Sequence, residues 1–161
     1  MIEILKINNP NWVANLGPLV QDFCDKIKMP NINYYSIIAY FQRTAQLGGE
    51  LSELWVAFED GLPVGFAHWC IRDIPLVGTV YFDYLYSKAN KREVVRRLIE
   101  EFLKYGVKHN SPWYMFDATK HPKLLKYFRR FAKQFNLNLT EQPYIPFLAR
   151  IKNESNKKSS H

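Results

Sequence analysis

Cysteine is scarce in this sequence of 161 residues, which contains only Cys24 and Cys70. Two isolated cysteines without C-x-x-C spacing exclude a disulfide framework, and we expect both to be small apolar residues in a reducing compartment. No apolar run approaches the ~20 residues that a membrane-spanning helix needs, and residues 1–12 lack the features of a signal peptide. These absences predict a soluble, cytoplasmic protein.

Several catalytic motifs are also missing. The four histidines form none of the common zinc-binding spacings with each other or with cysteine, so we expect no metal site. The sequence has no G-x-S-x-G element and no G-x-x-x-x-G-K-[ST] loop. Those motifs position a nucleophilic serine or the phosphates of a nucleoside triphosphate. Their absence means that no motif supports a serine hydrolase or a nucleoside triphosphatase function.

Apolar residues are plentiful, since 47% of the chain is hydrophobic and 16% is aromatic. This composition and length predict a single domain over residues 1–152, followed by a disordered polar tail over 153–161. Residues 1–86 carry 5 basic and 9 acidic side chains, a net charge of −4, whereas residues 87–161 carry 17 and 6, a net charge of +11. The basic half suits phosphates, nucleic acid or an anionic surface, although solvated helix faces produce the same pattern.

Hydrophobic periodicity divides the chain into alternating helical and extended segments. Asp60-Gly61 is a strong tight-turn signal between two strand-like segments, and Gly17-Pro18 is expected to interrupt or kink the first helix. We predict helices over 13–27, 34–45, 91–108 and 122–135, and strands over 2–7, 54–59, 64–72, 79–86, 113–117 and 144–151, with 137–139 as a short additional strand. This order predicts an α/β (α+β) fold: one twisted, mixed and mostly antiparallel sheet of about six or seven strands, flanked by about four helices.

Three segments carry a resemblance to a known family. They are the hairpin ELWVAFEDGLPVGFAHW at 53–69, the strand and long amphipathic helix at 79–108, and the final strand–helix–strand. Together they resemble the GNAT superfamily of acyl-CoA-dependent N-acyltransferases over residues 2–151. The resemblance implies the fold predicted above, acetyl-CoA or another acyl thioester as co-substrate, an amine-bearing small molecule or protein as acceptor, and a possible homodimer.

The sequence departs from the family at its glycine-rich motif, R/Q-G-x-G-x-G/A. The motif falls on residues 90–95, where Asn90 replaces the Arg/Gln and no glycine is present. In the family, glycines let backbone N–H groups approach the CoA pyrophosphate. A cluster of cations could bind the phosphates by charge instead, or could be a solvated first helical turn: Lys88, Lys91, Arg92, Arg96 and Arg97. Toxin-activating acyltransferases are also glycine-poor here and use an acyl carrier protein as donor.

Asp83 is the first candidate for the general base of an acyl transfer. It interrupts the apolar segment 80–85, and a carboxylate removed from water binds a proton more readily, as a base near neutral pH must. Strand alternation predicts that Asp83 shares a face with Tyr81 and Leu85. His68, inside VGFAHWC, is a second candidate, although a lone histidine in a strand is more often structural.

Other site residues follow from the resemblance. The family's equivalent of strand 79–86 lends its backbone to the pantetheine chain, which implies that Tyr84 and Leu85 lie near the thioester. The family's tyrosine acid falls on Phe128, which lacks a hydroxyl, and the neighbouring Tyr127 becomes the candidate acid. One residue along a helix is a rotation of about 100°, so Tyr127 lies on a different face from the family's tyrosine.

Three functions therefore remain open at the level of sequence, and whether the chain is an enzyme is one of the open points. The first hypothesis is a divergent N-acetyltransferase. The second is a non-catalytic GNAT-like interaction or structural protein, such as those that phage and mobile elements encode. The third is a basic nucleic-acid-binding protein that uses the cations of 88–108 and 122–135, although the aromatic residues of 124–135 fall on the apolar stripe and not among these charges.

Overall fold

A computed structural model describes residues 1–28, 32–48, 51–72, 78–111, 113–116, 126, 129–130, 132–134, 137–140 and 148–151. The chain divides into two compact units. Unit 1 comprises Met1–Ile71 and Phe82–Tyr105, and unit 2 comprises Arg72–Tyr81 and Gly106–His161.

The strands of unit 1 follow one another in the order β1-β2-β3-β4. Their bounds are Ile2–Lys6, Ser52–Glu59, Leu62–Arg72 and Thr79–Ser87, the last beginning in unit 2. Both β1 and β3 are antiparallel to β2, with Ile2 opposite Glu59 and Leu54 opposite His68. Asp60 and Gly61 connect β2 to β3 and both have positive φ angles, 52° and 78°. The tight turn predicted there is confirmed, because a two-residue hairpin turn of this kind needs positive φ at both positions.

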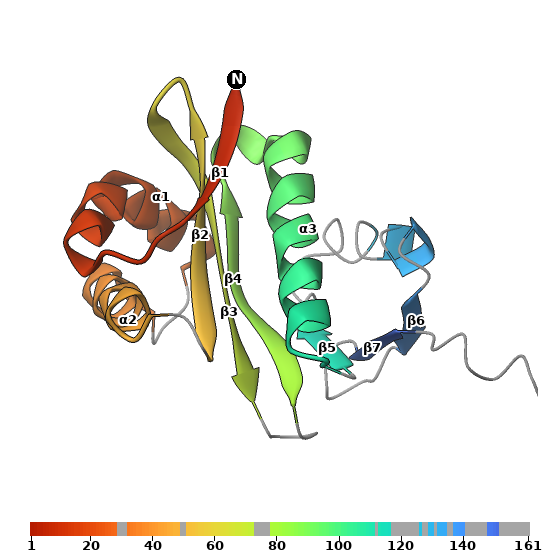
Figure 1. Ribbon diagram of the computed structural model, residues 1–161. Coiled ribbons are helices and arrows are strands. Elements are labelled where there is room, and N and C mark those ends of the chain that lie inside the picture. The colour runs from red at the N-terminus through yellow and green to blue at the C-terminus, as the bar shows by residue number, and fades with distance from the viewer. Residues whose placement is uncertain are drawn as a thin grey trace, which may run out of the picture. The chain divides into compact units, whose positions relative to one another are not determined.

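Helices cover both faces of these strands (Figure 1). A short 3-10 helix, η1 (Pro10–Leu16), leads into α1 (Gly17–Ile27), and α2 (Tyr34–Gln46) follows on the same face. The interruption predicted at Gly17-Pro18 is therefore the start of α1, where Pro18 occupies the first turn and needs no hydrogen-bond donor. The long helix α3 (Arg92–Lys108) packs on the opposite face. A reciprocal hydrogen-bonded cap between Asn33 and Ser36 begins α2.

Two aromatic layers separate these helices from the strands. On the face of α1 and α2, the Phe66 ring lies 5.4 Å from Phe23 and 5.3 Å from Phe41. On the face of α3, the Phe102 ring lies 4.5 Å from Phe82 and 5.7 Å from Trp69. Side chains of a strand alternate between faces, so Phe66 and Trp69, three positions apart on β3, supply the two different layers. All six rings are buried.

Gly65 on β3 lets α3 approach the strands closely. A Cβ atom at this position would lie 2.6 Å from a methyl of Val94 and 2.8 Å from the Tyr86 carbonyl oxygen. Both contacts are shorter than van der Waals distance, so any side chain at position 65 would push α3 and β4 away. The V-G pair that opens the second hairpin strand therefore has a packing role at the start of α3.

The alternation of β4 is interrupted near its centre. Phe82 packs against Phe102 on the α3 face, whereas the next two residues both face α2. Asp83 accepts a hydrogen bond from Tyr40, and the Tyr84 ring lies 6.2 Å from the Tyr40 ring. The predicted strict alternation therefore fails between Asp83 and Tyr84, where a local irregularity turns two consecutive side chains to one face.

Unit 2 contains the strands β5 (Trp113–Phe116), β6 (Leu137–Thr140) and β7 (Leu148–Ile151), in the order β5-β7-β6. Both pairings are antiparallel. Within the predicted helix 122–135, the described residues are helical, and four of its five predicted outward-facing cations are described and exposed: Lys126, Arg129, Arg130 and Lys133. Its predicted inner face, Lys123, Tyr127 and the tail 153–161 lie outside the described residues.

The mixed α/β architecture, with mostly antiparallel strands between flanking helices, confirms the predicted fold class. Within the described segments, no helix combines the length and the apolar character required to cross a membrane.

Candidate active site

A buried polar cluster surrounds Asp83. Three donors converge on its Oδ2 oxygen: the Tyr40 hydroxyl at 3.1 Å, His68 Nδ1 at 3.0 Å and Cys70 Sγ at 3.3 Å. The Asp83 side chain is 7% exposed. In such surroundings hydrogen bonds are stronger than in water and their geometry matters more. The two residues singled out from the sequence as base candidates, Asp83 and His68, are thus direct neighbours.

The spacing of the residues within each element explains how the cluster forms. His68 and Cys70 are two positions apart on β3 and therefore share a face. Tyr40 and Thr44 are four positions apart on α2, so they lie on the same face of the helix, about one turn from each other. Asp83 reaches the same place because β4 turns it toward α2. Three elements from different parts of the chain thus supply one group of polar side chains.

His68 connects the cluster to the interior. The ring has no exposed surface, and it is held by Thr44 Oγ1 at 2.9 Å from Nε2 and by Asp83 at Nδ1. A carboxylate at Nδ1 selects the tautomer that has its proton on this nitrogen, and in that tautomer Nε2 accepts from the Thr44 hydroxyl. The rings of Phe41 and Tyr40 lie 5.7 Å and 4.6 Å from the imidazole. Because it is enclosed on all these sides, the His68 ring lies in the interior, in contact with Asp83.

A second polar group lies at the far end of β4. Tyr86 donates a hydrogen bond to Asp22 on α1 and accepts one of 2.7 Å from Lys26 Nζ. The hydrogen bonds from Tyr86 and Lys26 hold the pKa of Asp22 below its usual value. Burial, followed by the hydrogen bond to Asp22, raises the pKa of Tyr86 above its usual value. This group links α1 to the strand just before the turn into α3.

The turn between β4 and α3 is the place where the family's glycine motif falls. It contains a short 3-10 helix, η2 (Lys88–Asn90), in which Ala89 has a left-handed conformation with φ 58° and ψ 23°. The Lys91 backbone N–H donates to Ser87 Oγ at 3.1 Å. A left-handed residue in a tight turn directs neighbouring N–H groups to one side, as anion-binding turns do. The turn thus contains one left-handed residue, Ala89, directly before residues 90–95, where the glycines are absent.

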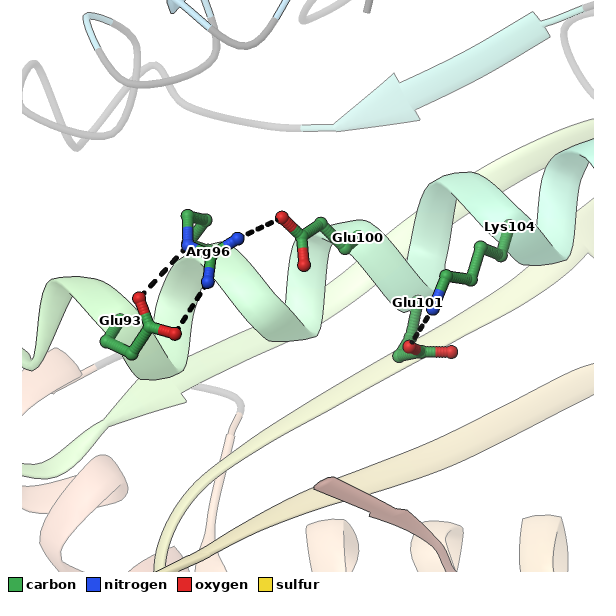
Figure 2. Close-up of polar contacts among 5 residues, drawn as sticks. All are labelled: Glu93, Arg96, Glu100, Glu101 and Lys104. Atoms are coloured by element: carbon green, nitrogen blue, oxygen red, sulfur yellow. Dashed lines mark hydrogen bonds and ion pairs between the residues drawn. The ribbon is translucent and has the colours of Figure 1, made fainter. Parts of the chain in front are cut away.

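Several of the cations near this turn already have partners. Lys91 pairs with Glu59 at the end of β2, and Arg97 donates to the Ile2 carbonyl. Arg96 pairs with Glu93 at 2.6 Å and with Glu100 (Figure 2). Further along α3, Lys104 pairs with Glu101 at 2.6 Å, as Figure 2 also shows. Lys88 and Arg92 are exposed beside the turn. Arg96 and Lys104 are thus paired within α3, whereas Lys91 and Arg97 have partners outside the helix.

The remaining predicted site residues have simple positions. Tyr84 packs its ring among aromatic side chains of α1 and α2, 5.9 Å from Phe23 and 5.8 Å from Phe41. Leu85 is half-buried. Tyr127 and the Asn90 side chain lie outside what the structure describes. Among the described residues, no group of three or more His, Cys, Asp or Glu side chains is arranged to hold a metal ion.

Sequence reasoning missed three members of the cluster: Tyr40, Thr44 and Cys70. The helical stripe on α2 identified the apolar positions Ile37 and Phe41, whereas Tyr40 and Thr44 lie beside that stripe. Two polar side chains one turn apart at the margin of a buried helix face were the available signal. Nothing local to α2 indicated that the partner would be a strand residue 43 positions later.

The sequence matches no protein-family model and no curated protein. The structure is similar to several solved ones. A "predicted acetyltransferase" with acetyl-CoA from Clostridium acetobutylicum is 17% identical, with a TM-score of 0.64 over 88% of this chain and 93% of that one. A ribosomal-protein-alanine N-acetyltransferase from Brucella melitensis is 15% identical, with a TM-score of 0.62 over 90% and 97%.

A third similar structure is AAC(6')-Iy in complex with the bisubstrate analogue CoA-S-monomethyl-acetylneamine. It is 13% identical, with a TM-score of 0.62 over 81% of this chain and 88% of that one. Each of these similarities spans most of both chains, which agrees with the element order and with the hairpin, strand and long helix described above. This chain has the fold of the GNAT acetyltransferases.

Proposed function

We propose that this chain is a divergent GNAT N-acyltransferase, which transfers an acyl group from an acyl-CoA thioester to an amine. The observation that carries the proposal is the buried cluster around Asp83. Acyl transfer to an amine requires a base, because alkylamines are protonated at neutral pH and only the neutral amine attacks a carbonyl carbon. A carboxylate on β4 that is oriented by a histidine has the chemistry of such a base.

The β4–α3 turn supports the proposed co-substrate. Ala89 holds the turn in a left-handed conformation, and the N-terminus of the 17-residue helix α3 follows directly. Helix N-termini and left-handed turns both favour negative charge. We propose that Lys88 and Arg92, which are exposed there, contact the CoA phosphates, and that Lys91 joins them when it leaves Glu59. Arg96 is engaged by two glutamates and is the weaker candidate.

The first test is binding of acetyl-CoA, measured by thermal unfolding and by calorimetry. A ligand present at 100 times its dissociation constant stabilises the folded state by about 2.7 kcal/mol, which is a shift of several degrees in Tm. We expect this shift with millimolar acetyl-CoA. The double variant Lys91→Ala/Arg92→Ala should weaken binding. The matched control is Lys104→Ala/Lys108→Ala, which removes the same charge from the opposite end of α3.

The second test is transfer itself, with n-butylamine as a generic alkylamine acceptor and release of the CoA thiol as the readout. Thiol release that depends on both acetyl-CoA and the amine supports the proposed function. Acetyl-CoA binding without thiol release would instead favour a non-catalytic GNAT-like protein. Absence of any acetyl-CoA binding would contradict a CoA-dependent enzyme and leave an acyl carrier protein or nucleic acid as the partner of the basic half.

A further inference from the structure

The Asp83 cluster is not equally buried throughout. His68 has no exposed surface, Thr44 and Cys70 are buried, and the Asp83 side chain is almost enclosed. Tyr40 is a half-buried residue of α2, and its hydroxyl donates to the Asp83 carboxylate. Tyr40 therefore differs from His68, Thr44 and Cys70, the other three residues around Asp83, which are buried.

We propose that Tyr40 is a catalytic residue which carries the proton from the attacking amine to Asp83. This inference rests on the proposed function, and it assigns to Tyr40 the contact with the substrate. A hydroxyl can accept one proton and donate another in the same step, so it can serve as a relay between two groups that do not touch. Asp83 is then the proton store, and His68 is a positioning residue that holds the carboxylate in place.

The arrangement of donors explains why a relay is needed. Oδ2 of Asp83 already accepts from three side chains, and those from β3 close it off on the inner side. An alkylammonium ion that approached this oxygen directly would lose most of its hydration in an enclosed space, which is costly for a charge. The Tyr40 hydroxyl, 3.1 Å from Oδ2, meets the ammonium group farther out.

The proton and electron balance of the proposed step is complete. The ammonium nitrogen gives one proton to the Tyr40 oxygen while the Tyr40 hydroxyl gives its own to Asp83 Oδ2, leaving a neutral amine and a protonated Asp83. The nitrogen lone pair then forms the C–N bond to the thioester carbonyl, and the C–S bond breaks with its electron pair on sulfur. A second proton from the nitrogen ends on the thiolate, and Asp83 returns its proton to solvent through Tyr40.

The test compares two nucleophiles that differ in protonation. n-Butylamine is protonated at pH 7, like a lysine side chain with a pKa of about 10.4, whereas hydroxylamine is neutral at that pH and needs no base to attack. We expect Tyr40→Phe to slow acetyl transfer to n-butylamine by at least about 10-fold, within the range of general-base effects. With hydroxylamine, the same variant should keep its rate within about 2-fold, because the relay is not used.

Tyr35→Phe is the matched control, since Tyr35 is a highly exposed tyrosine on the same helix, and it should leave both rates unchanged. Equal slowing of both reactions in Tyr40→Phe would assign Tyr40 a structural role and overturn the proposal. No slowing of either reaction would also overturn it.

The pH profile of the transfer rate gives an independent readout. Raising the pH should rescue Tyr40→Phe with n-butylamine, as more of the amine becomes neutral, and lack of rescue would also contradict the relay. A wild-type protein that transfers to neither nucleophile contradicts the proposed function itself.

Discussion

Two regions along and beyond β4 hold polar groups of different kinds. At the centre of the strand, Asp83 is buried and its neighbours are hydroxyl, thiol and imidazole groups. At the end that leads into α3, Lys91 and Glu59 form an ion pair in which each side chain is about one-third exposed, at 34% and 35%. The first group is enclosed by protein, whereas the second remains in contact with water.

The difference in burial predicts that the Asp83 cluster is rigid, whereas the partners of the Lys91–Glu59 ion pair can be replaced by other ions. Buried hydrogen bonds are costly to break, because a lost partner leaves a desolvated polar group. Partly exposed ion pairs contribute little to stability and are screened by salt, so either partner can be replaced by another ion at small cost. We therefore expect the Asp83 cluster to keep its geometry throughout a reaction. The turn before α3, in contrast, should exchange Glu59 for a phosphate.

The largest expected effect is on catalysis, from a change in the buried Asp83 cluster. Asp83→Asn preserves the shape of the side chain but removes its ability to accept a proton. We expect thiol release with n-butylamine to fall by about 100-fold or more, while calorimetry shows acetyl-CoA affinity within about 3-fold of wild type, because the phosphate-binding turn is untouched. Asp60→Asn, an exposed aspartate in the hairpin turn, is the control. Unchanged turnover in Asp83→Asn would exclude Asp83 as the base.

A smaller effect, on acetyl-CoA affinity, is expected from a change in the partly exposed Lys91–Glu59 ion pair. Glu59→Gln releases Lys91 from its ion pair and should tighten acetyl-CoA binding by about 2- to 5-fold at low salt, which corresponds to the modest energy of an exposed pair. The gain should disappear as ionic strength rises. Glu101→Gln makes the same change of charge far from the turn, next to Lys104, and is the control. Equal tightening in both variants would show that only net charge matters.

The smallest expected effect concerns Asp22, which lies beside the same end of β4. Its pKa is lowered chiefly by the hydrogen bond from Tyr86, so Tyr86→Phe should raise that pKa toward the ordinary value. A carboxyl with a lowered pKa stabilises the folded state above its unfolded pKa, and this contribution is lost as pH falls through the folded value. The variant should therefore lose less stability on acidification. NMR titration of the Asp22 carboxyl carbon measures the shift, with Tyr35→Phe as the reference, and an identical titration in both would refute the assignment.

Local sequence signals predicted local structure well. The Asp60-Gly61 turn, the break at Gly17-Pro18 and the long amphipathic helix after β4 were each predicted from neighbouring residues and are present in the structure. These features depend on backbone conformations that only a few residue types adopt, and on a periodicity that one short window contains.

The composition of the candidate site depends on contacts that no short window contains. Asp83 and His68 were identified separately, because each is a polar residue in an apolar strand. Their pairing, and their contact with Tyr40, bring β3, β4 and α2 together. No residue type near position 83 indicates the irregularity by which Asp83 and Tyr84 face the same side. The partner of Lys91 was equally unpredictable, since Glu59 lies 32 positions away in the chain.

The register of β1 against β2 has a consequence for folding kinetics. Ile2 lies opposite Glu59 and Lys6 opposite Trp55, so all of η1, α1 and α2 must fit within the loop that this pairing closes. Such closure costs more chain entropy than the adjacent hairpin of β2 and β3, and we expect β1 to join the sheet late. Late contacts mainly affect unfolding rates. Loss of the contacts that residues 1–6 make with β2 should therefore speed unfolding more than it slows folding.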